Sequence, residues 1–199
     1  MTSQQKVWDN IAPEWNELKK VPAIHTQNFL KKCTGKVLDL GSGSGRNLRE
    51  IKNGKMYLVD FSKEMIELAK AHAKKKKLDA EFRVANLTRI PYENNFFDFA
   101  ICNSALHCVE TEKDREKVVQ ELYRVLKPKA KAEISVWHKD TRRFKNAPKE
   151  KYIKWHDKGA RYYYLYSAKE IYELFEKNKF KIIFKENPKR SIVFIVQKN

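Results

Sequence analysis

The chain has few cysteines and no long apolar segment. Cys33, Cys102 and Cys108 are odd in number and show no C-x-x-C spacing, and Cys102 lies in an apolar strand pattern. We therefore expect buried free thiols in a reducing compartment, with no disulfide and no zinc or other metal site. The first residues contain neither a basic start nor an apolar run, and no segment approaches the roughly 18 apolar residues of a membrane span. This predicts a soluble, cytoplasmic protein that makes no membrane contact.

Acidic residues are also scarce, with 25 Asp and Glu against 42 Lys and Arg among 199 residues, a formal net charge of +17. Such an excess concentrates polyanions near the surface, which indicates a nucleic-acid partner. The alternative is a Lys-rich solvated surface, as in the run Lys74 to Lys77 at a predicted helix end. The length predicts one domain, residues 1–199, which buries roughly 70% of its unfolded surface.

Glycine is sparse except in the stretch VLDLGSGSGRN, where Gly41, Gly43 and Gly45 occupy every second position. The apolar residues before them predict a strand buried on both faces, as in the centre of a parallel sheet. Glycines let the backbone turn sharply and approach a ligand closely. Asp39 lies at the end of this strand, where burial of a carboxylate is unfavourable unless it meets a cationic or hydrogen-bonding group. An amino group on a sulfonium ligand would suit it.

A second apolar strand ends in Asp60, about 20 residues beyond Gly41. A carboxylate at this place can accept hydrogen bonds from both hydroxyls of a ribose. The expected order over residues 37–77 is strand, glycine loop, helix, strand with a terminal Asp, and helix. A lone glycine loop would be an ordinary turn, but this combination resembles the class I S-adenosylmethionine-dependent methyltransferases. The resemblance implies S-adenosylmethionine as the cofactor.

The same resemblance implies a Rossmann-like α/β fold. Its seven-stranded sheet is mostly parallel, with the last strand antiparallel and helices on both faces. Periodicity predicts strands at 81–84, 97–103, 181–184 and 192–196. Asn86 stands where the family has an Asp that accepts from the adenine amino group. The cofactor-binding residues implied are Asp39, Gly41, Gly43, Gly45, Asp60, Phe61, Asn86, Leu87 and Asn103.

The loop after the strand 97–103 holds Ser104 and His107, at the edge where open α/β sheets place their chemistry. A buried structural histidine is the alternative for His107. Two helices should precede the glycine loop, the first bent or broken at Pro13. The tryptophans of this segment, residues 1–35, suggest a lid over the cofactor, or simply helices packed on the core.

The segment 139–161 is a predicted basic insertion, with Phe144, Tyr152 and Trp155 between its lysines and arginines. Basic residues with exposed aromatic rings suit phosphate contacts and base stacking. A flexible, solvated loop is the alternative.

Four segments, VWDNIAPEW, NSALHCVETEKDR, ISVWHKD and ARYYYLYS, resemble the tRNA methyltransferases that esterify a carboxymethyl group on C5 of the wobble uridine. The chain departs from that family at Leu18 and Lys19, near a family Thr-Arg pair, and at Cys108 and Tyr164. A carboxylate is already ionised at neutral pH, so its methylation needs placement and no general base. The implied catalytic residues are Arg161, which would grip the carboxylate, and His107, which would orient it.

The residues expected to bind the substrate are Trp8, Ser104, Arg142, Arg143, Tyr162 and Tyr163. The expected partner is the anticodon arm of tRNA, whose splayed base can enter a pocket. The resemblance also suggests a small zinc-binding activator subunit on the third-strand edge, residues 81–84. Two alternatives stay open: a methyltransferase for a quinone-like small molecule, and an inactive RNA-binding subunit built on the same fold.

Overall fold

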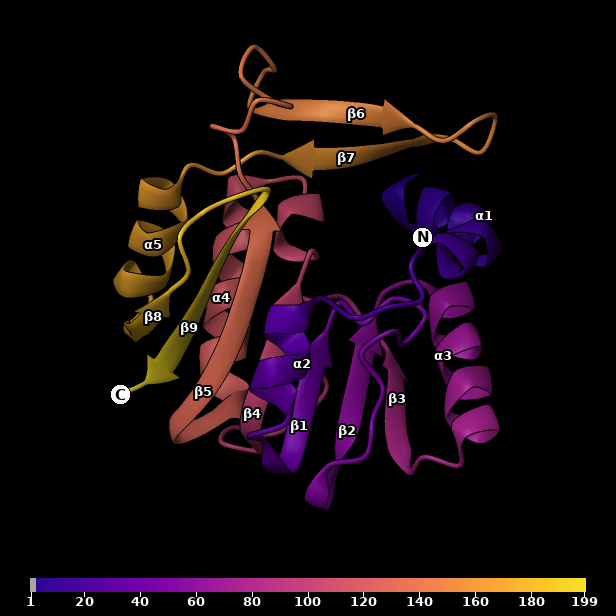
Figure 1. The fold of residues 1–199 in the computed structure, drawn as a ribbon, viewed down its shortest axis with the longest axis vertical. Helices are drawn as coiled ribbons and strands as arrows, with labels where there is room; N and C mark the ends of the chain where they lie inside the picture. Colours follow the sequence, from indigo (N-terminus) through magenta and orange to yellow (C-terminus); the bar gives the residue numbers. More distant parts are fainter. Residues whose placement is uncertain (1–2) are drawn as a thin grey trace.

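The structure is a computed structural model that describes residues 3–199. Seven strands form one sheet in the order β3-β2-β1-β4-β5-β9-β8 (Figure 1). These strands are β1 (Thr34–Leu40), β2 (Lys52–Asp60), β3 (Ala80–Val84), β4 (Phe97–Asn103), β5 (Leu126–Trp137), β8 (Phe180–Lys185) and β9 (Ser191–Lys198). Strands β1 to β5 are parallel, and β9 is antiparallel to both β5 and β8. The predicted fold is therefore confirmed.

The strand register brings the predicted cofactor residues to one edge of the sheet. Asp39 in β1 pairs with Leu58 in β2 and with Ile101 in β4. Asp60 and Asn103 thus end their strands beside the glycine loop that follows Leu40. The strand order reverses between β1 and β4, which is where open α/β sheets leave a crevice at the carboxyl ends of their strands.

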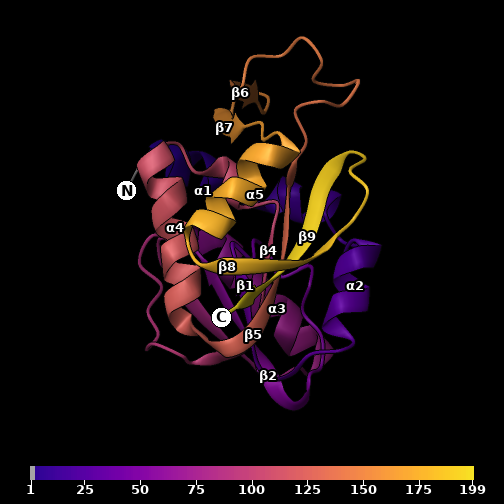
Figure 2. The ribbon, with the colours of Figure 1, turned by 90° about the vertical axis from the view of Figure 1, so that its left-hand side faces the viewer.

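Helices cover both faces of the sheet, as Figure 2 shows. On one face, α2 (Ile24–Leu30) and α3 (Lys63–Lys76) pack against apolar side chains of β1 and β2. On the other face, α4 (Glu112–Val125) and α5 (Ala168–Lys177) enclose the larger apolar core with β4, β5 and β9. Ser62 and Ser167 cap α3 and α5 through their side-chain oxygens. The short 3₁₀ helix η1 (Leu106–Cys108) follows β4.

The helix predicted between the glycine loop and the second strand is wrong. Residues 41–51 form turns, and β2 begins at Lys52. The connection offers only Leu48 and Ile51 as apolar anchors, too few for a helical face. Both pack in one cluster with Phe29 and Leu30 of α2, so α2 covers the surface that the missing helix would have covered.

The helix α1 (Ser3–Leu18) continues through Pro13, so of the predicted bend or break at Pro13 the break does not occur. Proline costs the helix one backbone hydrogen bond. Tertiary packing outweighs that cost, because Trp8, Ile11 and Ala12 are buried in a cluster with Met65 of α3. Of the predicted lid, residues 1–35, α1 lies over the carboxyl ends of the strands, whereas α2 lies against the sheet (Figure 1).

The basic segment contains a two-stranded antiparallel hairpin that the sequence patterns did not predict, formed by β6 (Glu150–Lys154) and β7 (Ala160–Tyr164). Figure 1 shows the hairpin across the top of the sheet, with α1 beneath its turn. The side chain of Glu14 accepts from the Trp155 indole N–H and pairs with Lys158. Gln4 donates to the Ala160 carbonyl at 3.1 Å. The hairpin and α1 therefore hold each other over the sheet edge.

The three cysteines are free, as predicted, with Cys33 and Cys102 buried. Burial raises the pKa of both thiols to about 12, which keeps them protonated and unreactive. Within residues 3–199, no helix is long and apolar enough to span a membrane.

Candidate active site

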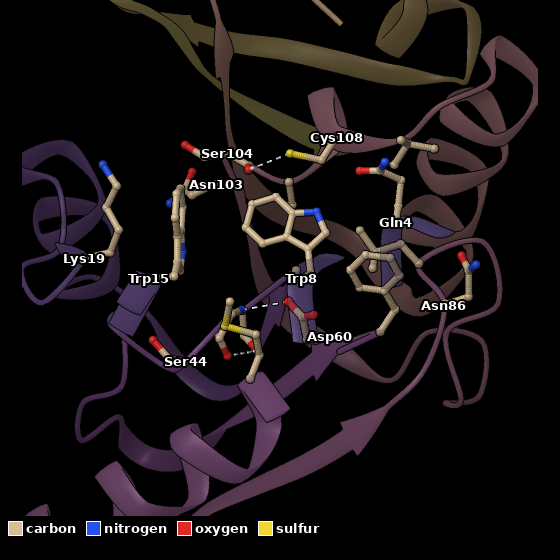
Figure 3. Close-up of a pocket in the computed structure, with 18 of the residues that line it drawn as sticks. Gln4, Trp8, Trp15, Lys19, Ser44, Asp60, Asn86, Asn103, Ser104 and Cys108 are labelled. Carbon is tan, nitrogen blue, oxygen red and sulfur yellow. Dashed lines mark hydrogen bonds between the residues drawn. The ribbon is translucent and has the colours of Figure 1, made fainter. Parts of the chain in front are cut away.

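A cavity of about 200 Å³ opens at the carboxyl ends of β1, β2 and β4, beneath α1. Its walls come from α1, the glycine loop, the end of β2, the segment after β3, and the turn that leads from β4 into α4. Figure 3 shows Trp8 in the middle of this wall, with Asp60 and Ser44 on one side of the indole and Ser104 on the other. Nine predicted residues line the cavity: Trp8, Gly41, Gly43, Asp60, Phe61, Asn86, Leu87, Asn103 and Ser104.

Asp60 joins the glycine loop to the end of β2. One of its carboxylate oxygens accepts from the Gly43 N–H at 2.8 Å, and the other accepts from the Ser62 N–H at 3.0 Å. Burial raises its pKa to about 6. Gly43 has φ +53, and a Cβ there would project into open space, with the nearest heavy atom 4.0 Å away. The backbone of the loop is thus accessible to a ligand that also reaches Asp60.

Asp39 lies deeper, behind the lining of the cavity. It is 1% exposed, and one carboxylate oxygen accepts from the Asn47 side chain at 3.2 Å. The other oxygen is buried and has no hydrogen-bond partner in the described part of the chain. Burial raises the pKa of Asp39 to about 7. An unsatisfied buried carboxylate suits a cationic ligand group.

Asn103 ends β4 and is held by α2 and β5. Its amide nitrogen donates to the Thr26 hydroxyl at 2.7 Å and to the Glu133 carboxylate at 3.1 Å. Its amide oxygen is buried and has no hydrogen-bond partner among residues 3–199. The next residue, Ser104, has φ +60, a left-handed conformation that costs energy in a residue with a Cβ and often marks a functional turn.

Asn86 faces the cavity, but its side-chain oxygen already accepts from the Thr88 N–H at 3.0 Å and from the Thr88 hydroxyl at 2.9 Å. Both lone pairs are in use, so accepting from an adenine amino group would require the Thr88 hydroxyl to turn away. Phe61 and Leu87 add apolar lining on which a flat ring can pack.

Of the two residues predicted to be catalytic, His107 is 1% exposed and does not line the cavity. Its Nδ1 accepts from the Trp137 N–H at 3.1 Å, and its ring stacks on the Trp137 indole at 5.1 Å. Burial lowers its pKa to about 3, so the imidazole is neutral at physiological pH. In this structure His107 supports the end of β5.

Arg161 does not line the cavity either; it lies in an aromatic box behind the tryptophan wall. Its guanidinium carbon is 4.6 Å from the Trp155 ring centre, 5.2 Å from that of Trp15 and 5.9 Å from that of Trp8. It donates to the Tyr163 hydroxyl at 2.7 Å, while its Nε is buried and unpartnered.

The predicted substrate residues of the hairpin region divide into buried and exposed ones. Tyr162 and Tyr163 are 2% and 1% exposed, so neither ring can stack on a base without a rearrangement. Arg142 and Arg143 are exposed on the loop before the hairpin. Of the aromatic residues expected at that surface, Tyr152 is 60% exposed, whereas Phe144 is buried.

Trp15, Lys19 and Arg46 are among the lining residues that the sequence patterns did not assign to the site. The pKa of Lys19 is lowered by burial and by the positive charges of Arg46, Arg161 and Arg143, so these cations repel one another. Within residues 3–199, none of them pairs with a carboxylate. Arg143 and Arg161 were predicted from the sequence, but in a chain with 42 basic residues nothing marks Lys19 and Arg46 as residues of the cavity.

These residues fit S-adenosylmethionine. Asp60 can accept from ribose hydroxyls, the open backbone at Gly43 admits the ligand, and the unpartnered oxygens of Asp39 and Asn103 can accept from its amino group. Phe61 and Leu87 can pack on the adenine.

Comparisons with known proteins agree with this fit. Residues 38–134 match the methyltransferase-domain family. A 2-phytyl-1,4-naphtoquinone methyltransferase of Trichormus variabilis is 35% identical over 156 residues, which cover 70% of this chain and 67% of that protein. A tRNA (carboxymethyluridine(34)-5-O)-methyltransferase of Arabidopsis thaliana is 31% identical over 134 residues, 66% of this chain but only 32% of that protein.

Two solved structures share the fold. A methyltransferase of Haloferax volcanii, in complex with the Trm112 methyltransferase activator, has a TM-score of 0.75 at 16% identity, covering 99% of this chain and 98% of that one. The 1,6-didemethyltoxoflavin-N1-methyltransferase of Burkholderia thailandensis, with bound S-adenosylhomocysteine, has a TM-score of 0.70 at 16% identity and covers 100% and 92%. The chain therefore belongs to the S-adenosylmethionine-dependent methyltransferases, with S-adenosylmethionine as its cofactor.

Proposed function

We propose that this enzyme methylates a carboxylate, namely that of a 5-carboxymethyl group on the wobble uridine of tRNA, to form an ester. The observation that carries this proposal is Lys19, which lines the cavity and is repelled by the positive charges of Arg143 and Arg161. They have no acidic partner in the described chain, and bringing like charges together is unfavourable unless an anion joins them. A carboxylate among aromatic walls satisfies that requirement.

The protonation state of the site supports the same acceptor. Methylation of a hydroxyl, an amine or a carbon needs a group that removes a proton, whereas a carboxylate arrives ionised. His107 is a poor base, because it is buried, its pKa is lowered to about 3, and its Nδ1 already accepts from Trp137. The protein then has to place the acceptor and exclude water.

Bound S-adenosylmethionine supplies an electrophilic methyl group on a sulfonium. Lys19 lines the cavity and can hold one carboxylate oxygen while leaving the other free to attack. Arg161 would join Lys19 if Trp8 or Trp15 shifted, since its guanidinium lies within 6 Å of both rings. The tryptophans of α1 and the hairpin would exclude water from the reacting groups.

The basic surface above the cavity supports an RNA acceptor. Arg142 and Arg143 are exposed beside the hairpin, and Tyr152 offers a ring that is 60% exposed. Phosphate contacts from such residues would hold the anticodon arm while a splayed base enters the cavity.

An activator subunit is part of the proposal. β3 is the terminal strand of the sheet, so one of its edges has no strand partner among the described residues, and Val84 on it is 48% exposed. Unpaired edge strands are ready sites for pairing with another chain. The Haloferax volcanii structure of the same fold was solved with an activator.

A second candidate is a quinone-like small molecule, favoured by the 35% identity to the naphthoquinone methyltransferase. Glu110 lines the cavity and is a carboxylate that could take a proton from a ring hydroxyl. Its side chain accepts only a long bond, 3.4 Å, from the Tyr152 hydroxyl.

The test uses labelled S-adenosylmethionine with three acceptors: tRNA that carries the carboxymethyl group, the same tRNA without it, and a reduced naphthoquinone. Each reaction is run with and without a zinc-binding activator. We expect label only on the carboxymethylated tRNA, and mild alkali should release it because esters hydrolyse. Lys19→Gln should lower this transfer, whereas Lys20→Gln, on the exposed side of the same segment, should not. Alkali-stable label on the quinone would refute the carboxylate proposal.

A further inference from the structure

Glu110, in the turn that leads from β4 into α4, is a carboxylate of the cavity wall to which the methylation of tRNA assigns no role. Arg115 donates to its backbone carbonyl at 2.8 Å, which fixes the turn. Among residues 3–199 its carboxylate pairs with no cation and accepts only the 3.4 Å bond from the Tyr152 hydroxyl. In a chain of net charge +17, a carboxylate that no cation neutralises is available to a donor on a ligand.

The other carboxylates that line the cavity already have partners. Asp60 accepts from two backbone N–H groups beside the glycine loop. Asp114 accepts from the Thr111 hydroxyl at 2.8 Å at the start of α4. Glu110 is therefore the carboxylate of this wall that is left to contact an acceptor molecule.

Trp8 supplies a donor in the same wall. Its side chain is 8% exposed, and its indole N–H is buried without an acceptor in the part of the chain that the structure describes. Figure 3 shows this nitrogen on the edge of the indole turned away from Trp15, on the side of Gln4 and Cys108. Gln4 does not accept from it, because both ends of the Gln4 amide bond the backbone of β7. A buried N–H without a partner indicates a missing acceptor atom.

These two groups belong to one part of the cavity. Cys108 packs against the apolar cluster that contains Trp8, and Glu110 follows Cys108 by two residues. Arg115, which holds the turn at Glu110, also donates to the Tyr162 hydroxyl of β7 at 3.2 Å. The wall thus presents an indole N–H, which can only donate, and a carboxylate, which can only accept.

Such a pair is complementary to a ring that carries an acceptor next to a donor. Uracil has this edge, with O4 as acceptor and N3–H as donor, whereas cytosine has the reverse, an N4–H donor and an N3 acceptor. We propose that Trp8 donates to O4 of the acceptor base and Glu110 accepts from its N3–H, so that these two residues select uridine against cytidine. This inference rests on the proposed carboxymethyl acceptor and adds how its base is recognised.

The position of the carboxymethyl group agrees with this arrangement. C5 of the base adjoins C4, so the carboxymethyl group and O4 leave the ring on neighbouring carbons. Lys19 and Trp8 both line the cavity, and can hold the carboxylate and O4 of one base.

Methyl transfer from labelled S-adenosylmethionine to two tRNAs tests the proposal, with a zinc-binding activator present. Both tRNAs carry a carboxymethyl group on C5 of the wobble base, which is uracil in one and cytosine in the other. The carboxylate is the same in both, so only the base edge differs. We expect kcat/KM of the parent to be at least about 100-fold higher for the uridine tRNA, because both hydrogen bonds are lost with cytidine.

Glu110→Gln keeps the shape of the side chain, but its amide can turn either to accept from uridine N3–H or to donate to cytidine N3. It should narrow the ratio of the two kcat/KM values about 10-fold, chiefly through faster transfer to cytidine. Trp8→Phe keeps an aromatic ring without the donor and should narrow the ratio about 10-fold, chiefly through slower transfer to uridine. Glu112→Gln is the matched control and should keep the parent ratio, since Glu112 is exposed on α4 and absent from the cavity lining.

Each ratio compares two substrates of one protein, so it does not depend on the folded fraction of a variant. Equal kcat/KM of the parent on the two tRNAs, or the parent ratio in Glu110→Gln, would overturn the reading of the base and leave the carboxylate acceptor in place. No label from the parent on either tRNA would refute the proposed function itself, and the reading of the base with it.

Discussion

Replacing Asp39 by asparagine tests whether the buried carboxylate lowers the stability of the cofactor-free protein. Asp39 is 1% exposed, and burial raises its pKa to about 7 from an ordinary value of 3.8. The folded chain therefore binds this proton more tightly than the unfolded chain does. The stability that protonated Asp39 provides is fully present below about pH 4 and is lost as the pH rises to about 7.

A shift of about 3 pKa units corresponds to at most about 4 kcal/mol at pH 8. Asparagine is isosteric, and its oxygen can still accept from Asn47. We expect cofactor-free Asp39→Asn to be more stable than the parent by about 2 to 4 kcal/mol at pH 8. At pH 4 the two proteins should differ by less than about 1 kcal/mol.

Urea unfolding of the cofactor-free proteins at several pH values between 4 and 8 measures this difference. The stability of the variant should still depend on pH to some extent, because burial also raises the pKa of Asp60 to about 6. Asp79→Asn is the control, since the Asp79 side chain is 81% exposed. If Asp39→Asn and the parent lose stability to the same extent as the pH rises, the negative charge of Asp39 does not destabilise the folded protein. The reasoning about its unpartnered oxygen would then be refuted.

Three further predictions follow from the site and the surface above it. Asp60→Ala should weaken binding of S-adenosylhomocysteine by about 2 to 4 kcal/mol in calorimetry, through lost charge-assisted bonds; equal affinity would remove Asp60 from the ribose site. Reversing Arg142 and Arg143 to Glu should flatten the dependence of tRNA affinity on salt, and an identical slope would make their loop a solvated surface. Arg161→Lys should slow single-turnover methyl transfer at saturating cofactor, and Arg161→Ala should cost more, about 3 kcal/mol; parent-like rates would make Arg161 a packing residue of the aromatic box.

The cofactor half of the site could be predicted because its signals are local. A buried strand, a glycine loop and a terminal Asp each occupy a short stretch, and parallel strands bring their carboxyl ends to one edge whatever the rest of the chain does. The sheet edge at which Asp39, Gly43 and Asp60 lie was therefore predictable from sequence. The helix expected after the loop did not form, because the connection has only Leu48 and Ile51 as apolar anchors and both pack against α2.

The arrangement of basic and aromatic side chains around the cavity was decided by tertiary structure. Lys19 and Arg46 are ordinary basic residues in sequence, and only the packing of α1 over the glycine loop brings them into one cavity with no carboxylate partner. His107 and Arg161 were chosen for their chemistry, yet the side chains packed around them left both buried behind the cavity wall. The sequence by itself thus determined the sheet, its switch point and the cofactor edge. The contact of α1 with the β6–β7 hairpin could not be predicted, because it joins segments more than a hundred residues apart, and it brings basic residues from both segments near the cavity.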